Sequence, residues 1–352
     1  MSFPRFQFNP QTRRKLARFR SLRRGYWSFL ALTLLALLTV VGELLVNSRA
    51  LIVRYEGKFY FPTYTAFHPG SDFGEPYDYE TNYRALKARF AAEDSGNWVL
   101  LPPVPYNPYE NDFRDGIYPP TAPSAAERHY LGTDTIGRDI LARLFYGFRN
   151  ALIFSAFYIS IVYGLGILIG CLMAWRAGWT DLLGQRAIEI WSNLPFLYIV
   201  IIVASVIRPD LTMLIILTGL FSWTGMTYYF RTATYREKAR DYVAAAEVLG
   251  ASTSRILFRH ILPNTISTLV TFIPFTLAGA ITALTSLDFL GFGLPPPTPS
   301  WGELLQQGTA NLNAPWIVAS AFGAMVIVLT LVTFVGEAIR DAFDPKKFTT
   351  YQ

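Results

Sequence analysis

Apolar residues along this chain gather in long runs instead of recurring at a strand or helix period. Six runs are long enough to cross a hydrocarbon core of about 30 Å, at about 1.5 Å per helical residue. They cover residues 28–46, 151–175, 187–207, 211–230, 265–287 and 316–337. The pattern predicts an all-α integral membrane protein with six transmembrane helices.

The polar stretch between the first two runs, residues 47–149, is rich in proline and aromatic residues. Its last part, LGTDTIGRDILARLFYG, has the pattern of an amphipathic helix, with Asp134 as a plausible N-cap and Asp139 and Arg143 as an i,i+4 pair. One face would hold Ile140, Leu141, Leu144 and Phe145. We expect this helix to lie on the membrane surface before the second span.

Basic residues predict the orientation of the spans. Residues 1–27 contain many arginines and no acid, whereas residues 288–315 contain neither Lys nor Arg. Further basic residues predicted on the side of the N-terminus are Arg176, Arg186, Arg231, Arg236, Lys238, Arg240, Arg255, Arg259, Arg340, Lys346 and Lys347. Because cytoplasmic loops carry an excess of Lys and Arg, both termini are predicted to be cytoplasmic. An uncleaved first span is favoured over a signal peptide, because the apolar run is long and NSRA is a poor cleavage site.

This topology predicts five regions. They are a basic N-terminus (1–27), the first transmembrane helix (28–46), a periplasmic segment (47–149), a five-helix core with a coupling loop at 231–264 (150–340), and a cytoplasmic tail (341–352).

Composition excludes several classes of function. The hydrophobic share is 52% and the charged share only 16%, so the net charge of +6 reflects membrane orientation and not nucleic-acid binding. The single cysteine, Cys171, forms no intrachain disulfide. The histidines His68, His129 and His260 are far apart, which gives little support to a metal site.

A charged hairpin, DYVAAAEVLGASTSRILFRHILPN, lies between the fourth and fifth spans at residues 241–264. Gly250 would end a first helix, Ser252 would cap a second, and Pro263 would close the loop before the fifth span. One alanine-rich face is predicted from Tyr242, Ala245, Ala246 and Leu249. From the pattern alone, a connector lying on the lipid headgroups is as plausible as a docking surface.

This hairpin resembles the cytoplasmic "EAA" loop of ABC importer permeases. The family pattern is Glu-Ala-Ala, then a glycine, then Leu-Pro after a spacer. Its glutamate falls on Ala244 here, so this chain lacks the charged side chain of the family at that position. The positions that carry the resemblance are Ala245, Ala246, Gly250, His260, Leu262 and Pro263. In the family this loop docks into a groove on a cytoplasmic ATPase.

Other stretches resemble the second-permease type of oligopeptide, dipeptide and nickel importers. They are LGTDTIGRDILARLFYGFRNAL, LTSLDFLGFGLPPPTPSWGELLQQG and GEAIRDAFDP. The motif positions on the periplasmic side are Gly132, Thr133, Asp134, Asp288, Gly291 and Gly293, although the DFLGFG glycines also suit a fixed turn without a ligand. RRGYWS, LIVRYEGKFYFP and SDFGEPYDY resemble the Yej type of microcin C importer permease.

The resemblance implies a permease subunit of the bacterial inner membrane that imports peptides or peptide-like compounds, microcin C being the narrower expectation. It implies a second permease, ATPase subunits that hold ATP and Mg, a periplasmic substrate-binding protein and surrounding membrane lipid. We expect this chain to hold no cofactor, no catalytic residue and no nucleic-acid partner. It has no G-x-x-x-x-G-K-[ST] loop that could bind the phosphates of ATP.

Polar residues and prolines within the spans are candidates for the translocation pathway. These are Ser192, Asn193, Pro195, Pro274, Thr276, Thr282, Thr285 and Ser286. The alternative for each hydroxyl is a hydrogen bond back to its own helix or to a neighbouring helix.

Two other classes of protein compete with an ABC permease. A proton-coupled secondary transporter needs intramembrane acids or histidines, and only Glu43 and Glu189 fall within spans, with Glu337 at an edge. A membrane enzyme would need an acid–base pair or metal cluster in residues 47–149, and no spacing marks one. The secondary transporter remains the alternative.

Overall fold

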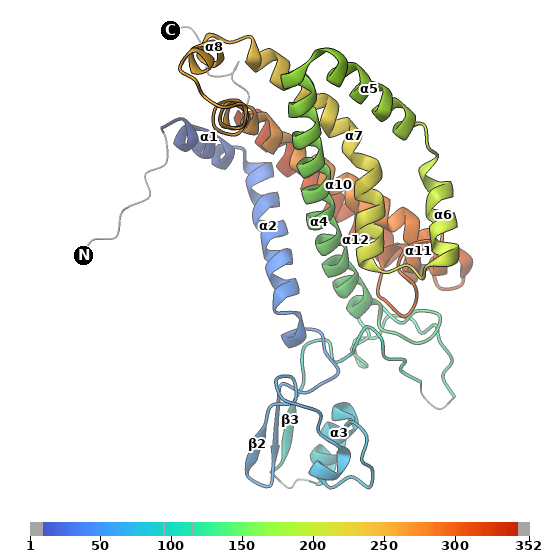
Figure 1. Ribbon diagram of the computed structural model, residues 1–352. Coiled ribbons are helices and arrows are strands. Elements are labelled where there is room, and N and C mark those ends of the chain that lie inside the picture. Colours follow the sequence, from blue (N-terminus) through green and yellow to red (C-terminus); the bar gives the residue numbers. More distant parts are fainter. Residues whose placement is uncertain (1–9, 94–95, 114–115, 344–352) are drawn as a thin grey trace, which may run out of the picture. The chain divides into compact units, whose positions relative to one another are not determined.

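The computed structural model describes residues 10–93, 96–113 and 116–343 (Figure 1). The contacts within the chain divide it into two compact units. Unit 1 comprises the described parts of 1–33, 152–284 and 327–352, and unit 2 comprises those of 34–151 and 285–326. Lys346 and Lys347 of the predicted tail lie outside the described residues.

Long helices dominate the described chain. They are α1 (Pro10–Ser21), α2 (Arg23–Val40), α4 (Ile140–Arg176), α5 (Gly178–Ser192), α6 (Phe196–Val206), α7 (Leu211–Lys238), α10 (Leu262–Phe289) and α12 (Pro315–Phe343). Among the described residues, α4, α7, α10 from Leu269 and α12 are long and apolar enough to span a membrane. The bent pair α5 and α6 adds a fifth candidate. The helical membrane class is therefore confirmed.

The first predicted span begins and ends earlier in the chain than expected. Helix α2 ends at Val40 and is followed by one 3₁₀ turn, Gly42–Leu44, so the expectation of a helix to Val46 is wrong. The backbone at Leu45 and Asn47 pairs with Val104 instead, through N–H···O distances of 3.0 and 3.1 Å. That pairing replaces the helical hydrogen bonds that another turn would need.

The third predicted span is broken. Helices α5 and α6 meet at a bend of 66°, with Asn193, Leu194 and Pro195 between them (Figure 1). Pro195 has no N–H and restricts the residue before it, so a helix cannot run through this position unchanged. The continuous span predicted over 187–207 is therefore wrong, and Pro195 begins α6 as its N-cap residue.

Helix α4 runs without a break from Ile140 to Arg176. The amphipathic stretch before residue 150 is thus its first turns, and the predicted separate surface helix is wrong. The N-cap also differs, because the Asp139 carboxylate accepts a hydrogen bond from the Ala142 N–H at 2.7 Å. Asp134 closes the preceding turn, accepting from the N–H of Arg138 at 2.9 Å.

The hairpin leads directly into the next long helix. It consists of α8 (Asp241–Val248), α9 (Thr253–Arg255) and a π-helical turn (Ile256–Ile261) that continues into α10. Pro263 lies in the first turn of α10 and does not close a loop, contrary to our expectation. The wider π turn before it relieves the clash that a proline ring makes with the preceding turn of an α-helix.

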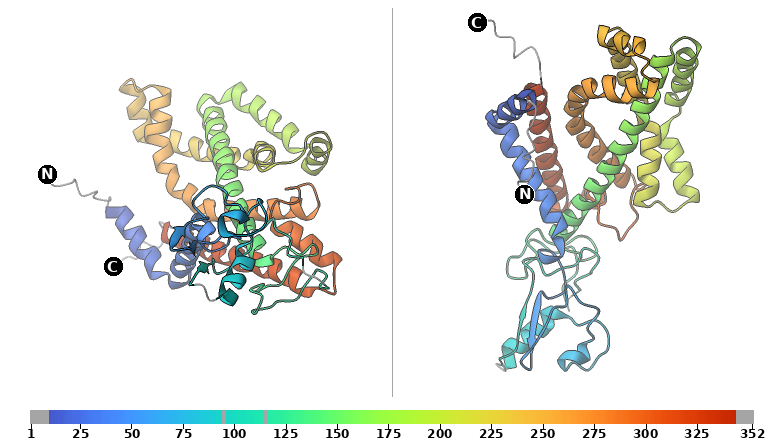
Figure 2. Two further views of the ribbon diagram at one scale, coloured as in Figure 1. Left: turned by 90° about the horizontal axis from the view of Figure 1, so that it is seen from below. Right: turned by 60° about the vertical axis from the view of Figure 1, so that its left-hand side comes forward.

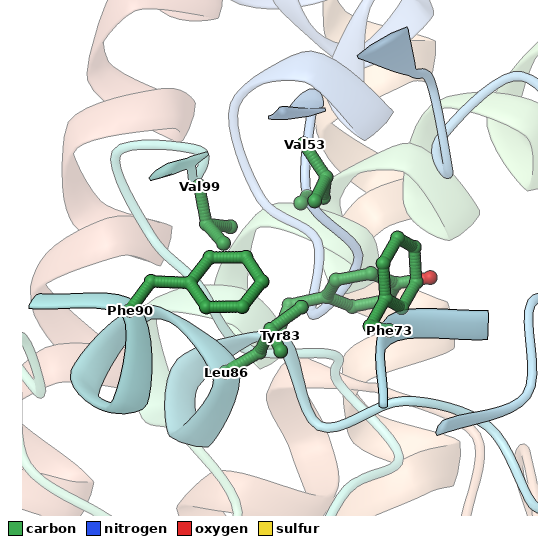
Figure 3. Packing of buried hydrophobic residues seen from close by; sticks show 7 residues of the cluster. Val53, Phe73, Tyr83, Leu86, Phe90 and Val99 are labelled. Atoms are coloured by element: carbon green, nitrogen blue, oxygen red, sulfur yellow. The ribbon is translucent and has the colours of Figure 1, made fainter. Parts of the chain in front are cut away.

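Unit 2 contains a small β-sheet that the hydrophobic pattern did not reveal. Strands β1 (Ile52–Tyr55), β2 (Lys58–Tyr60) and β3 (Trp98–Leu100) form an antiparallel sheet in the order β2-β1-β3. Helix α3 (Tyr83–Glu93) and the 3₁₀ turn Gly70–Phe73 pack against it (Figure 3). The buried core contains Ala50, Val53, Phe73, Tyr83, Leu86, Phe90 and Val99.

A second short helix of unit 2, α11 (Trp301–Ala310), begins at a side-chain cap. The Ser300 hydroxyl accepts from the N–H of Glu303 at 3.2 Å and donates to the Asp288 carboxylate at 2.7 Å. The same carboxylate accepts from the N–H of Leu294 at 2.7 Å. Asp288 thereby joins the end of α10, the DFLGFG turn and the start of α11.

Candidate functional site

Because α10 begins at Leu262, the hairpin that we predicted at 241–264 is limited to residues 241–261. Its first helix, α8, ends at a well-defined turn. Gly250 has a φ of +74°, and its N–H donates to the Glu247 carbonyl at 2.9 Å. The N–H of Ala251 donates to the Ala246 carbonyl at 3.0 Å, which completes a Schellman motif. The Ser252 hydroxyl caps the next turn by accepting from the N–H of Arg255. The predicted roles of Gly250 and Ser252 as helix-ending and capping residues are confirmed.

The face that α8 buries differs from the predicted one. Val243 and Ala246 are buried and Tyr242 is half-buried, whereas Ala244 and Ala245 are exposed. The helix ends in two exposed apolar side chains, Val248 at 88% and Leu249 at 86%. The predicted face of Tyr242, Ala245, Ala246 and Leu249 is therefore wrong for Ala245 and Leu249, because Val243 and Ala246 are the residues of α8 that pack with Cys171 and Phe230. The exposed surface of α8 consists of Asp241, Ala244, Ala245, Glu247 and Val248, and Leu249 follows it.

The other side of the hairpin is held against two long helices by an apolar core. Buried members of this core are Val243, Ala246, Ile256, Leu257 and Ile261 of the hairpin, Cys171 of α4 and Phe230 of α7.

Hydrogen bonds add to this attachment. The Trp175 indole donates to the Thr253 hydroxyl at 3.1 Å, and the Lys238 ammonium donates to the Trp175 carbonyl at 2.6 Å. The hairpin and the ends of α4 and α7 therefore form one packed body.

The predicted Leu-Pro end of the loop lies in the transition from the π turn to α10. His260 is half-buried, and its carbonyl accepts from the Asn264 side chain at 2.9 Å. Leu262 packs at the edge of the hairpin core, and Pro263 is exposed. These residues form the base of the hairpin. They follow the exposed end at Leu249 later in the chain.

An ionic cluster in unit 2, formed by Asp134, Arg138, Arg143 and Glu303, is the most unusual polar feature of the described chain. Arg138 Nε donates to Asp134 Oδ2 and its Nη2 to Glu303 Oε1, each at 2.7 Å. Arg143 Nη2 donates to Glu303 Oε2. All four side chains are buried, and two guanidinium groups balance two carboxylates. Such pairing is the condition under which charges tolerate burial.

Arg143 does not form the i,i+4 pair with Asp139 that we predicted. Besides Glu303, it donates to the carbonyls of Pro108 at 2.9 Å and Pro297 at 3.1 Å. Asp139 is turned toward His129, whose Nδ1 lies 2.7 Å from Asp139 Oδ2. The difference arises because Asp139 caps α4 while Arg143, one turn later, reaches the loops of unit 2.

His129 is buried between two carboxylates. Its Nε2 lies 3.1 Å from Asp112 Oδ2, and its ring stacks on Tyr106 with centroids 3.9 Å apart. Burial lowers the pKa of His129, but the hydrogen bonds to Asp112 and Asp139 outweigh it, so the pKa is raised above its usual value. The two carboxylates therefore favour the protonated form of His129, which joins residues 112 and 139. No group of three or more His, Cys, Asp or Glu side chains in the described ranges is arranged to hold a metal.

The remaining motif residues form turns around these groups. Gly132 has a φ of +79° and lies so close to Trp316 that a Cβ would be 2.9 Å from the indole ring. The Thr133 hydroxyl accepts from the N–H of Thr121 at 2.8 Å. Gly291 has a φ of +80°, and a Cβ on Gly293 would collide with the Asp288 carboxylate. These contacts support the turn that the DFLGFG pattern indicated.

Sequence reasoning missed Arg138, His129 and Glu303 as partners. The available signal was the presence of Arg138 and Arg143 beside the apolar run of α4, since charges beside apolar runs need partners. Pairing them with Glu303, which is 160 residues beyond Arg143, required the fold.

Two of the candidate pathway hydroxyls are hydrogen-bonded to their own helix. Thr276 and Thr282 donate to the carbonyls of Phe272 at 3.1 Å and Ala278 at 2.9 Å. Thr276 also contacts the Tyr163 hydroxyl of α4 at 2.9 Å. The Asn193 side chain donates to the Glu189 carbonyl at 2.7 Å.

The other pathway candidates differ in how far their side chains are buried. Ser192, Pro195 and Ser286 are exposed, whereas Pro274 and Thr285 are buried. Their place in a pathway stays a prediction.

Comparisons with known proteins show which family and which relatives the sequence of this chain is similar to. Residues 166–349 match the family described as binding-protein-dependent transport system inner membrane component. The chain is 41% identical over 341 residues to the inner membrane ABC transporter permease protein YejE of Escherichia coli (strain K12), covering 97% of this chain and 99% of the relative.

Two further relatives extend the comparison. The peptidoglycan transport system permease protein YejE of Agrobacterium fabrum is 38% identical over 362 residues, covering 97% of this chain and 94% of the relative. The oligopeptide transport system permease protein OppC of Escherichia coli (strain K12) is 32% identical over 250 residues, covering 71% and 82%.

The chain belongs to the family of binding-protein-dependent transport system inner membrane components. It is an ABC peptide importer permease of the Yej type, as its motifs indicated. Members of this family are multi-pass membrane permease components of ABC transporters and are not themselves enzymes.

Proposed function

We propose that this chain forms half of the translocation pathway of an ATP-driven importer that moves peptides or peptide-like compounds from periplasm to cytoplasm. A second permease completes the pore, ATPase subunits supply the energy from ATP and Mg, and a periplasmic binding protein delivers the substrate. Family membership supports each of these partners in general terms.

Six spans with both termini in the cytoplasm remain our proposed topology. Helix α2 would be the first span, because its 18 residues at about 1.5 Å each reach about 27 Å, and Arg23 and Arg24 can extend toward the headgroups. The bent pair α5–α6 would be the third. Cysteine-accessibility labelling in a Cys171→Ala background tests this, since Cys171 is the chain's single cysteine. Labelling from outside at residue 250 would contradict the topology.

The observation that carries the proposed function is the contrast between the two sides of the hairpin. One side is packed on α4 and α7, and the other presents Val248 and Leu249 almost fully exposed. Exposed apolar side chains next to a rigid turn suit a groove on another protein. Closure of the ATPase subunits would then move the hairpin together with α4 and α7 as one lever.

A charge reversal of this surface tests the proposal. The double variant Val248→Asp/Leu249→Asp should abolish co-purification of the ATPase subunits and substrate uptake, while the permease still accumulates in the membrane. Ser254→Asp is the matched control, because it adds charge at another exposed hairpin position. Unchanged ATPase binding and uptake in the double variant would refute the docking role.

Energy coupling separates the proposal from a proton-coupled secondary transporter. In proteoliposomes containing the whole complex, uptake should require ATP and persist when an uncoupler removes the proton gradient. Uptake that continues without ATP but stops with the uncoupler would favour the secondary transporter.

The solvent face of the unit 2 sheet is the surface that we propose for the binding protein. Arg54 is paired in register with Phe59 on one side and Trp98 on the other, and all three are exposed. A solvent-facing sheet surface is ordinarily polar, whereas aromatic residues and arginine are enriched at protein interfaces. Trp98→Ser/Phe59→Ser should weaken binding of the binding protein to the purified complex without changing ATPase co-purification; equal binding would contradict this assignment.

For the substrate, we propose peptides or peptide-like compounds, with microcin C-like peptide–nucleotides as the narrower hypothesis. OppC is named for oligopeptide transport and the Agrobacterium protein for peptidoglycan transport, which supports cargo of this class. Uptake of labelled peptides, peptidoglycan fragments and a microcin C-like compound by cells with and without this chain would decide among them. No difference for any of the three would contradict the substrate class.

A further inference from the structure

A cavity of about 350 Å³ lies in unit 1 between the start of α2 and the end of α12. Its volume is at the low end of the roughly 300–1,000 Å³ that is typical of small-molecule sites. The proposed coupling and translocation roles do not use it. In the right-hand view of Figure 2, α2 (blue) lies beside α12 (dark red).

Close packing at Gly25 determines where the two helices meet. A Cβ on Gly25 would lie 2.1 Å from the Ala338 Cβ, so only glycine permits this approach. The longer side chains of Arg23, Arg24 and Glu337 then line the space beside the contact.

The cavity carries opposite charges on its two walls. Arg23 and Arg24 line it from α2, and Glu337 and Asp341 line it from α12. Within the described part of the chain, none of the ion pairs involves Arg23, Arg24 or Glu337. Two cations and a carboxylate are thus available to a ligand that carries both a negative and a positive group.

The position along both helices corresponds to the level of lipid headgroups. The apolar run of α2 begins at Ser28, just after the two arginines, and the apolar run of α12 ends at Gly336, just before Glu337. Trp27 is 66% exposed beside this boundary. Aromatic residues of this kind mark the interface between hydrocarbon and headgroups.

We propose that this cavity binds the headgroup of phosphatidylethanolamine. Arg23 and Arg24 would donate to the phosphate, and the primary ammonium would donate to Glu337. Phosphatidylglycerol lacks the ammonium and would leave the Glu337 carboxylate without compensation. Phosphatidylcholine carries a trimethylammonium that has no N–H to donate. The proposal rests on α2 and α12 spanning the membrane, and not on ATPase docking.

Native mass spectrometry of the delipidated complex, titrated with the three lipids bearing identical acyl chains, tests the site. Phosphatidylethanolamine should bind the intact protein most tightly. Arg23→Gln/Arg24→Gln should weaken its binding about tenfold or more, as expected for loss of hydrogen bonds to a charged group. Arg13→Gln/Arg14→Gln, which removes two exposed arginines of α1 outside the cavity, should leave it unchanged.

Glu337→Gln supplies the decisive comparison. It should reduce binding of phosphatidylethanolamine and leave or raise that of phosphatidylglycerol, because only the former uses a carboxylate. Tighter binding of phosphatidylglycerol to the unmodified protein, or no change of preference in Glu337→Gln, would overturn the proposal. ATPase co-purification should stay intact in this variant, so a failed lipid test and a failed coupling test are distinguishable.

Discussion

The hairpin and the ionic cluster are built from opposite kinds of side chain. The hairpin attaches to α4 and α7 through apolar residues such as Val243 and Phe230, and leaves its apolar end exposed. The cluster around Glu303 buries four charges and leaves none of them to solvent. Apolar packing has no directional requirement, so the hairpin surface can meet a partner, whereas paired ions specify one geometry for the segments they join.

Long-range contacts also differ between the two regions. The hairpin core draws on residues between Ile167 and Leu269, which lie on the hairpin and the helices around it. Arg138, which is paired with Asp134, reaches Glu303 across 165 residues, and Arg143 adds the loops at Pro108 and Pro297. These turns of unit 2 therefore depend on a few charged residues, and the hairpin depends on many small apolar contacts.

Breaking the cluster should produce the largest effect on stability. Arg143→Met removes one cation and leaves Glu303 and Asp134 sharing Arg138, which should destabilise the protein by about 3–5 kcal/mol. Thermal unfolding of the detergent-purified protein, followed by tryptophan fluorescence, measures the loss.

Arg149→Met is the control for this prediction. Arg149 also lies on α4, is 44% exposed and is 3.8 Å from Glu43, so its removal should change stability by about 0–1 kcal/mol. Equal losses of stability in the two variants would show that the buried ion pairs of the cluster contribute no more to stability than an exposed ion pair.

A smaller effect is expected from pH. Because hydrogen bonds to Asp112 and Asp139 raise the pKa of His129, the protonated ring stabilises the fold, and this contribution is fully present below the unfolded pKa of about 6.5. It is lost as pH rises through the higher folded-state pKa. The facing groups are the two carboxylates, the Tyr106 ring and Arg84, which lies 3.7 Å from Asp112.

Unfolding temperatures measured upward from about pH 6.5 check this sign. The unmodified protein should lose stability relative to His129→Asn as pH rises, so the difference between their unfolding temperatures should become smaller. A gap that stays constant or widens toward alkaline pH would mean that His129 is not held as a cation.

Much of the architecture was predictable because apolar runs longer than a span have few alternatives. Helices α7, α10 and α12 coincide with predicted runs, and the Gly250–Ser252 turn follows from local capping chemistry. What sequence reasoning missed depends on tertiary pairing. The end of α2 at Val40 needs Val104, and the small sheet uses strands of three or four residues, too short for a periodic signal.

The candidate site was predictable to a similar extent. The position of the hairpin and its final glycine follow from the pattern DYVAAAEVLG, but the face that α8 exposes does not. Alanine and valine are nearly equivalent in a helical pattern, so only contact with Phe230 and Cys171 determines that Val243 turns inward and Leu249 outward.

Photo-crosslinking from the end of α8 tests the central claim most directly. A photo-reactive phenylalanine in place of Leu249, introduced in the native host, should crosslink to a cytoplasmic ATPase subunit, and ATP should change the yield. The same group in place of Trp179, an exposed residue of α5, serves as the comparison. Crosslinks from position 249 only to lipid or to the permease itself would contradict the account of the hairpin as the docking site for the motor.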